Sequence, residues 1–239
     1  MRNLLIIFIC TLALLVTAGC KKGFNPDKEK IAGSSINKQI TEYLSKARKT
    51  KDDNVKAKML GRASELLAEK GDYKKAAQVA RRAKRANPTQ KIALATIGEY
   101  YISQGKYKEA EFALMEALTS DSNYARANYL MGNACFALKK LGDARKYYEL
   151  ALTKNSKDIR IYNNLAMVYF KTGKMNQALS LLEKGIEKRP NYAMTYKNAG
   201  IVAEKLNKKS HAKNYFNKYI TLNPAGDDRE VVKQWLKKI

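Results

Sequence analysis

The sequence predicts an all-α protein made of stacked pairs of antiparallel helices. The first support is a period, because Ala76, Ala110, Ala144, Ala178 and Ala212 are each 34 residues apart. Within each period, two stretches of about 14 residues with helical apolar spacing flank a turn that often contains glycine. The composition agrees, since 45% of the 239 residues are hydrophobic and 28% are charged, which is typical of a globular chain. A repeat of this length does not bury its apolar face alone, so neighbouring repeats must stack.

The N-terminal residues predict an export signal rather than part of the fold. Arg2 gives a positive head, residues 4–16 form an apolar run, and small residues precede Cys20. The run has 13 residues, whereas a membrane-spanning helix needs roughly 20 apolar residues. We therefore predict a signal peptide at residues 1–19.

The segment that ends at Cys20 resembles a bacterial lipoprotein lipobox, although Thr17 stands where a leucine-like residue is usual. The resemblance implies that the Cys20 thiol carries a diacylglyceryl group and that cleavage before it frees an amine for a further acyl chain. Several acyl chains on one residue suffice for stable membrane anchoring. Lys21 in the next position resembles an outer-membrane address, so we expect a bacterial envelope protein at the outer rather than the inner membrane. The alternative is a plain secretory signal with an incidental cysteine.

Two segments precede the repeats. Residues 20–35 contain glycine, proline and serine without an apolar period, which predicts a flexible tether after the lipidated cysteine. Ile36, Ile40, Leu44 and Ala47 then follow helical spacing, with Ser35 as a candidate N-cap. This stripe predicts an N-terminal capping helix at residues 36–56.

The repeats follow, and glycine or alanine marks the middle of the first helix in four of them. Gly98, Gly132, Ala166 and Gly200 are each 34 residues apart. Small residues at these points allow paired helices to reach their usual spacing of about 8–10 Å. After the repeats, an amphipathic stretch at 227–239 predicts a capping helix with Trp235 as core filler. The five repeats within residues 57–226 are repeat 1 (57–90), repeat 2 (91–124), repeat 3 (125–158), repeat 4 (159–192) and repeat 5 (193–226).

The pattern resembles the tetratricopeptide repeat family. The family signature of aromatic, Leu-Gly, aromatic, Ala, aromatic and Pro is most complete in repeat 4, as Tyr162, Leu165-Ala166, Tyr169, Ala178, Leu182 and Pro190. The resemblance implies a right-handed superhelical solenoid with a capping helix at each end. It also implies a concave wall built from the first helix of each pair, on which a protein or peptide partner binds. The architecture looks like that of pilotin-type lipoproteins of type IV pilus biogenesis, and more loosely like repeat lipoproteins of outer-membrane protein assembly.

Within a repeat, the second, fifth, sixth, ninth, twelfth and thirteenth residues share one face of the first helix. In the later repeats this face combines asparagine amides, which donate to and accept from a peptide backbone, with cations that suit a carboxylate. The set matches a carboxylate clamp only in part, and the asparagines could equally follow the repeat consensus alone. The candidate partner-binding residues are Arg126, Asn133, Arg160, Asn163, Asn164, Lys171, Lys197, Asn198 and Lys205.

Catalytic and metal-binding functions are excluded by the residue inventory. His211 is the only histidine and has no neighbouring cysteine or histidine, so no metal set forms around it. The turn at 171–174 lacks the second glycine and the Ser or Thr of a phosphate-binding loop. We therefore predict a scaffold that is not an enzyme and needs no cofactor or metal.

The formal net charge of +24 raises a second hypothesis. The charge is spread over the repeats rather than clustered, and the chain shows no nucleic-acid-binding motif, so we expect no nucleic-acid partner. Anionic headgroups suit a lipid-tethered protein better. The alternative to a scaffold is thus a basic protein that binds a membrane surface or an anionic polymer without a specific groove ligand.

Overall fold

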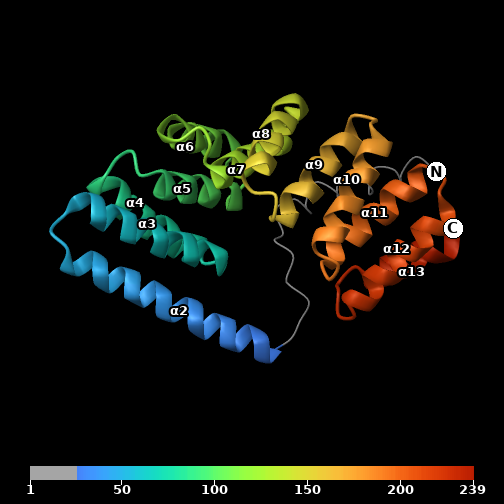
Figure 1. Ribbon diagram of the computed structural model, residues 1–239, viewed down its shortest axis with the longest axis horizontal. Coiled ribbons are helices and arrows are strands. Elements are labelled where there is room, and N and C mark those ends of the chain that lie inside the picture. The colour runs from blue at the N-terminus through green and yellow to red at the C-terminus, as the bar shows by residue number, and fades with distance from the viewer. Residues whose placement is uncertain (1–25) are drawn as a thin grey trace. The chain divides into compact units, whose positions relative to one another are not determined.

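The computed structural model describes the backbone of residues 26–239 and the side chains of residues 35–239. The predicted signal peptide and Cys20 therefore lie outside the described residues. All regular secondary structure in the described part is helical (Figure 1), which confirms the all-α fold class. The helices are α2 (Pro26–Lys49), α3 (Asp53–Glu69), α4 (Tyr73–Ala86), α5 (Lys91–Ser103), α6 (Tyr107–Ser120), α7 (Ala125–Ala137), α8 (Leu141–Lys154), α9 (Ile159–Lys171), α10 (Met175–Lys188), α11 (Ala193–Lys205), α12 (Lys209–Leu222) and α13 (Arg229–Lys238).

The helix register follows the 34-residue period. Helices α5, α7, α9 and α11 begin at residues 91, 125, 159 and 193, which are the first residues of repeats 2 to 5. The most extensive contacts join the first and second helices of each repeat, and first helices of successive repeats also touch, as α3 touches α5. Among the described residues, no helix combines the length and the apolar character that a membrane span requires.

The N-terminal segments differ from the predicted bounds. Helix α2 already begins at Pro26, so residues 26–35 of the predicted tether are helical and Ser35 lies inside the helix rather than at its N-cap. Proline is well tolerated in the first turn of a helix, because its missing N–H would have no intrahelical partner there. The predicted capping helix also ends earlier, at Lys49, because Asp52 caps a new helix by accepting hydrogen bonds from the backbone N–H groups of Asn54 and Val55.

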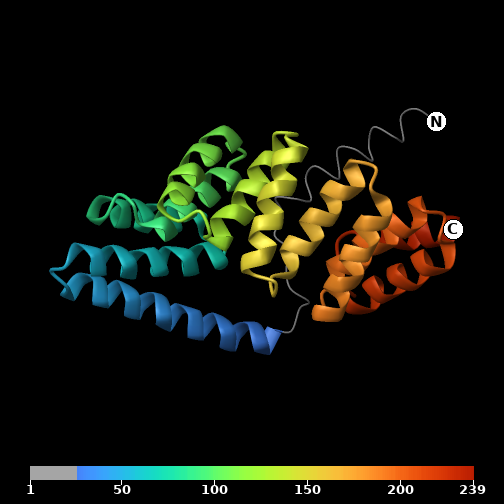
Figure 2. The ribbon, with the colours of Figure 1, turned by 45° about the horizontal axis from the view of Figure 1, so that its top comes forward.

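The chain divides into two compact units. The N-terminal unit contains α2 to α8 (residues 26–154), and the C-terminal unit contains α9 to α13 (residues 155–239). In the N-terminal unit, α2 runs along α3 (Figure 2) and buries Ile40 and Ala47 in a core that α3 and α4 share. In the C-terminal unit, Trp235 of α13 packs against Phe216 with ring centroids 5.7 Å apart. Trp235 thus contributes to the core, as its place on the apolar side of the helix predicted.

Small residues set the spacing of the helix pairs in both units. A Cβ atom on Gly132 would stand 2.5 Å from the ring of Tyr148, and one on Gly200 would stand 2.5 Å from the ring of Phe216. No real Cβ comes so close to a fixed neighbour, so these helices reach their spacing only with glycine at these points.

The turn between the helices of each repeat needs one residue with a positive φ. Glycine fills this position in repeats 1, 2 and 4, at residues 71, 105 and 173. Repeat 3 has Lys139 with φ 62° and repeat 5 has Asn207 with φ 58°. The left-handed conformation is therefore required even where the residue has a Cβ, which disfavours it.

Candidate partner-binding face

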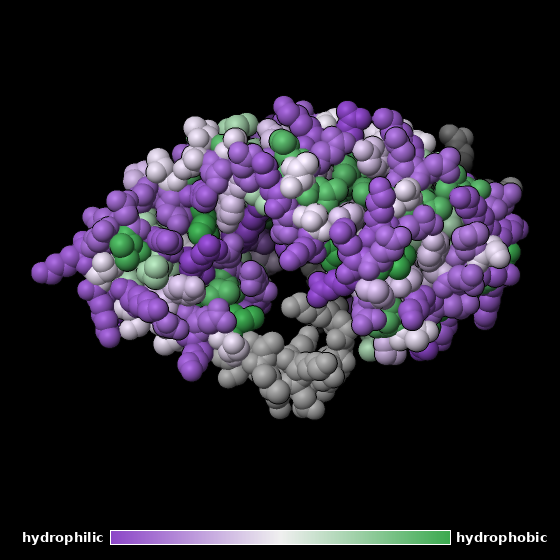
Figure 3. All heavy atoms as spheres, in the orientation of Figure 1, coloured by the Kyte–Doolittle hydropathy of each residue, from purple (hydrophilic) through white to green (hydrophobic). Residues whose placement is uncertain are grey.

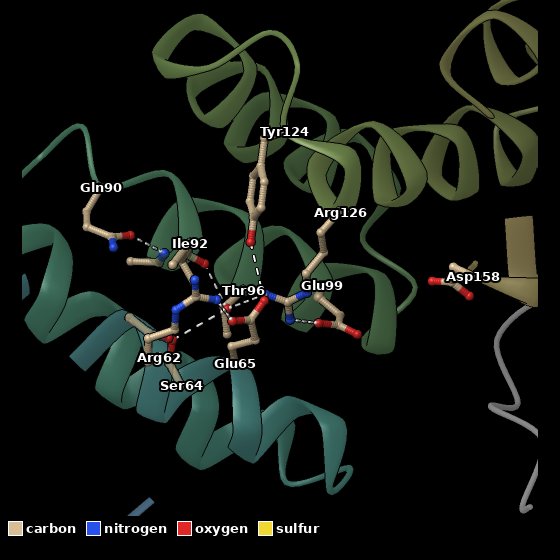
Figure 4. Close-up of polar contacts among 12 residues, drawn as sticks. Arg62, Ser64, Glu65, Gln90, Ile92, Thr96, Glu99, Tyr124, Arg126 and Asp158 are labelled. Atoms are coloured by element: carbon tan, nitrogen blue, oxygen red, sulfur yellow. Dashed lines mark hydrogen bonds and ion pairs between the residues drawn. The ribbon is translucent and has the colours of Figure 1, made fainter. Parts of the chain in front are cut away.

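The first helices of the N-terminal unit carry a network of charged side chains, which we call the charge network. It comprises Arg62 and Glu65 of α3, Glu99 of α5, Arg126 of α7, and Tyr124 just before α7. Figure 4 shows these side chains converging from three successive repeats. The four charged members occupy the second, sixth or ninth position of their repeats, which share the predicted wall. The sequence did not indicate that these side chains bind one another.

Arg126 is the centre of the charge network. Its guanidinium forms an ion pair with Glu99, lies 3.5 Å from Glu65 Oε1, and donates to Thr96 Oγ1 at 3.1 Å. Glu65 also pairs with Arg62 at 2.7 Å and accepts a hydrogen bond from the Tyr124 hydroxyl at 3.3 Å. The Arg126, Glu65 and Glu99 side chains are only 18%, 14% and 19% exposed, so water screens these attractions weakly.

The environment of Arg126 keeps it charged. Burial disfavours the charged guanidinium, but the negative charges of Glu99 and Glu65 outweigh burial and raise the pKa of Arg126. Burial also raises the pKa of Tyr124 to about 12, so its hydroxyl stays protonated and donates. With two arginines and two glutamates the network is neutral. The cation predicted to meet a partner's carboxylate at Arg126 is therefore already held by carboxylates of the chain.

The first helices of the C-terminal unit carry amides in the corresponding place. Asn163 Nδ2 donates to the backbone oxygen of Ile159 at 3.0 Å and to Thr195 Oγ1 at 2.9 Å. Asn198 Nδ2 donates to Asn163 Oδ1 at 2.9 Å. Asn163 is buried whereas Asn198 is half-buried. The bonds between Asn163, Thr195 and Asn198 join α9 to α11. Asn163 therefore stabilises the packing of successive repeats, and Asn198 is the more accessible of the two asparagines.

A buried ion pair near the end of the C-terminal unit joins α11 to the residue that precedes α13. Lys197 of α11 is 2% exposed and its Nζ lies 2.6 Å from Asp228 Oδ2, just before α13. The Tyr219 hydroxyl donates to the other Asp228 oxygen. Burial opposes ionisation of Asp228, but the hydrogen bonds from Lys197 and Tyr219 prevail and hold its pKa below the usual value. The pair therefore fixes the start of the capping helix α13.

The predicted partner-binding residues thus separate into three groups, which are buried, engaged in the charge network, or accessible. Asn133 is buried and accepts a hydrogen bond from the Tyr148 hydroxyl at 2.8 Å, and Asn163 and Lys197 are buried as described. We do not retain these three as partner contacts, because the adjacent helix covers each of them. Arg126 is engaged in the charge network. The side chains that remain accessible are those of Arg160, Asn164, Lys171, Asn198 and Lys205, all on α9 and α11.

One of the accessible cations is partly neutralised. Arg160 forms a bidentate salt bridge with Asp158, in which Nε donates at 2.9 Å and Nη2 donates at 2.6 Å. The Arg160 side chain is nonetheless 55% exposed. Asp228 and Asp158 were not predicted from the sequence as partners of the candidate cations. A signal for Asp228 was present, since it stands three periods after Arg126 and therefore occupies the same repeat position.

Metal-ligating groups and the one described cysteine bear on what chemistry the described residues support. They contain no group of three metal-ligating side chains that could hold an ion. Cys135 is buried, and burial raises the pKa of its thiol to about 11, which makes the reactive thiolate scarce at neutral pH. The geometry thus defines a class, a repeat protein of stacked helix pairs whose accessible polar face suits binding.

Comparison with known proteins gives the family. Three family models described as tetratricopeptide repeat match residues 57–90, 96–159 and 157–225. The chain therefore belongs to the tetratricopeptide repeat family, whose members are generally non-catalytic scaffolds. No curated protein matches the sequence.

Solved structures share the fold. YrrB, described as a tetratricopeptide repeat protein with an unusual peptide-binding site, is 20% identical over 84% of this chain and 98% of its own, with a TM-score of 0.60. Pseudomonas aeruginosa PilF is 18% identical over 85% of each chain, with a TM-score of 0.66. PilW, described as a type IV pilus biogenesis factor, is 18% identical over 76% of this chain and 84% of its own, with a TM-score of 0.69. At such identities the likeness shows the fold alone.

Proposed function

We propose that the protein is a lipid-anchored, non-catalytic scaffold of the bacterial cell envelope, which binds a protein or peptide partner in the assembly of an envelope complex. Cys20 carries the lipid, and the outer membrane is the proposed location. The partner lies against the accessible polar side chains of α9 and α11. The likeness in fold to a peptide-binding protein and to a pilus biogenesis factor supports this proposal.

One observation supports placing the partner-binding face on α9 and α11. Helices α9 and α11 expose Lys171 and Lys205 and leave Asn164 and Asn198 half-buried, with the half-buried apolar side chains of Met167, Phe170 and Met194 on the same helices. Amides can pair with a backbone, cations with a carboxylate, and apolar side chains with those of a bound segment. In the N-terminal unit the same wall is neutralised by its own charge network and offers less to a partner.

Crosslinking in the native cell tests the binding face. A photo-crosslinking residue in place of Asn164 or Asn198 should capture one defined envelope protein. The same residue in place of Asn217, which is exposed on the second helix α12, is the matched control and should not. Substituting Asn198→Ala together with Lys205→Ala should reduce capture at Asn164 by about tenfold, since two polar contacts are lost. Equal capture from α9 and α12 would refute the proposed face.

Lipidation is tested separately. The variant Cys20→Ala should leave the membrane fraction and lose the mass of the acyl chains. A variant that stays in the membrane fraction at an unchanged mass would remove the anchor from the proposal without affecting the binding face.

A further inference from the structure

Helix α4 has the most one-sided charge of the described helices. Its 14 residues include six cations and no carboxylate. Its inner side is built from Ala76, Ala77, Val79, Ala80 and Ala83, which are all buried. The cations therefore have only the outer side of the helix to occupy, along about 21 Å at 1.5 Å per residue. They are Lys74, Lys75, Arg81, Arg82, Lys84 and Arg85.

Most of this charge is not neutralised locally. Lys75 pairs with Asp72 at 3.1 Å and Lys84 pairs with Glu116 of α6 at 2.7 Å. The exposed side chains of Lys74, Arg82 and Arg85 form no ion pair with a carboxylate of the described residues, and the guanidinium of Arg81 lies over the ring of Tyr100 instead, 5.6 Å from its centroid. Six cations against two carboxylates leave a surplus of four positive charges.

Helix α6, which is bonded to α4 through Glu116, carries two exposed apolar side chains. On α6, Phe112 is 72% exposed and Met115 is 48% exposed. The neighbouring Ala113 lies in the same buried cluster as Val79, Ala80 and Ala83 of α4, and the bond from Lys84 to Glu116 also joins the two helices. The face shown in Figure 3 is largely hydrophilic with small hydrophobic patches, and Phe112 is the most exposed large apolar side chain among the described residues.

We propose that α4, with Phe112 and Met115 of α6, forms a membrane-contacting surface that binds anionic phospholipid headgroups. We call it the basic outer face. A row of six cations, four of which pair with no carboxylate of the described residues, meets the diffuse negative charge of such a membrane, while an aromatic and a thioether side chain enter the boundary between headgroups and acyl chains. The surface lies on second helices of the N-terminal unit, whereas the proposed partner face lies on first helices of the C-terminal unit. It goes beyond the proposed scaffold function and does not depend on the anchor at Cys20.

The test uses the chain from Lys21 to Ile239, which retains every residue of both buried clusters. We measure its binding to vesicles of phosphatidylcholine mixed with phosphatidylglycerol, and to vesicles of phosphatidylcholine alone. The variant Lys74→Gln/Arg82→Gln/Arg85→Gln should bind the anionic vesicles about 100-fold more weakly, because each nearby cation contributes about a fivefold factor. The wild type should bind the neutral vesicles much more weakly and should lose anionic binding at high salt.

A matched control removes the same charge elsewhere. Lys209, Lys213 and Lys218 are exposed cations on α12, a second helix that also lacks carboxylates. Their replacement by glutamine should weaken binding less than about threefold, since they lie outside the basic outer face. Phe112→Ala should weaken anionic binding about fivefold through lost apolar burial. Because all these side chains are exposed, melting temperatures should stay unchanged.

Three results would overturn the proposal. The wild type could fail to bind anionic vesicles. The α4 and α12 variants could lose binding equally, which would assign it to overall charge. The α4 variant could keep vesicle binding yet lose binding to poly-glutamate, which would reassign the surface to an acidic polypeptide. None of these outcomes alters crosslinking from α9 and α11, so the scaffold function stands or falls separately.

Discussion

The two units use the same repeat position for ion pairs of opposite polarity. Arg126 and Asp228 occupy the second position of a period, three periods apart, and each reaches back to the first helix of the preceding repeat. In the N-terminal unit a cation there meets Glu99 and Glu65, whereas in the C-terminal unit an anion there meets Lys197. The second position of a repeat therefore determines that its side chain reaches the preceding first helix. It does not determine which sign of charge the side chain carries. The difference lies in redundancy, because Arg126 has two carboxylates and Lys197 has one.

The largest effect is expected from breaking the single pair. Asp228→Ala leaves Lys197 98% buried and without its carboxylate, so we expect the free energy of unfolding to fall by about 3 kcal/mol. Chemical denaturation measures it. Asp227→Ala, at an exposed neighbour, is the control and should have little effect. Adding Lys197→Met should restore much of the loss, and a double variant as unstable as the single one would contradict this account.

The same pair predicts a dependence on pH. Because the folded pKa of Asp228 is lowered, its contribution is complete above its unfolded pKa of about 3.9 and is lost as the pH falls through the folded pKa. The stability difference between wild type and Asp228→Asn should therefore be constant between about pH 5 and 8 and shrink below about pH 4. A difference that shrank on raising the pH would have the wrong sign.

A second substitution tests what the two units share. Gly132→Ala in the N-terminal unit and Gly200→Ala in the C-terminal unit should each cost about 2 kcal/mol, because the added methyl group meets a buried ring. Gly142→Ala, on α8 with nothing within 4 Å of the added Cβ, is the control. If Gly132→Ala were as stable as Gly142→Ala, the close approach would not limit the helix spacing.

Redundancy in the charge network is tested by Glu99→Gln. Glu65 remains within 3.5 Å of Arg126, so we expect a loss of about 1–2 kcal/mol, less than for Asp228→Ala. Adding Glu65→Gln should cost more than the sum of the two single changes, since only then is Arg126 left without a carboxylate. Strict additivity in this double-mutant cycle would mean that the two glutamates act independently.

The smallest effect concerns the inter-helix turns. Lys139→Gly in the N-terminal unit should raise the free energy of unfolding by about 1 kcal/mol, because glycine adopts positive φ without a Cβ clash. Asn207→Gly in the C-terminal unit should gain about half as much, since asparagine already tolerates this conformation. Thermal melts of both variants beside the wild type measure the gain. An equal gain at both sites would show that residue type does not matter there.

Much of the fold could be predicted from the 34-residue period of the sequence. The candidate site could be predicted only in part. The starts of α5, α7, α9 and α11 coincide with the repeat boundaries because each repeat has the same local apolar spacing. The N-terminal end of α2 did not follow, since residues 26–35 lack that spacing and form a helix nonetheless. Asn163 and Lys197 were placed on the correct helices, yet they are buried, because the fifth position of a repeat faces the next first helix as well as the wall.

The all-α class, the length and number of the repeats, the helix pairs, and the positions of their glycines and turns could all be predicted from the amino-acid sequence. These properties depend on residues within one period, where backbone preference and apolar spacing act locally. Which polar side chains remain accessible depends instead on the packing of helices from different repeats. Lys197 meets Asp228 across 31 residues and Arg126 meets Glu65 across 61. Burial and pairing at such separations depend on which helices stack, and no local pattern contains that information.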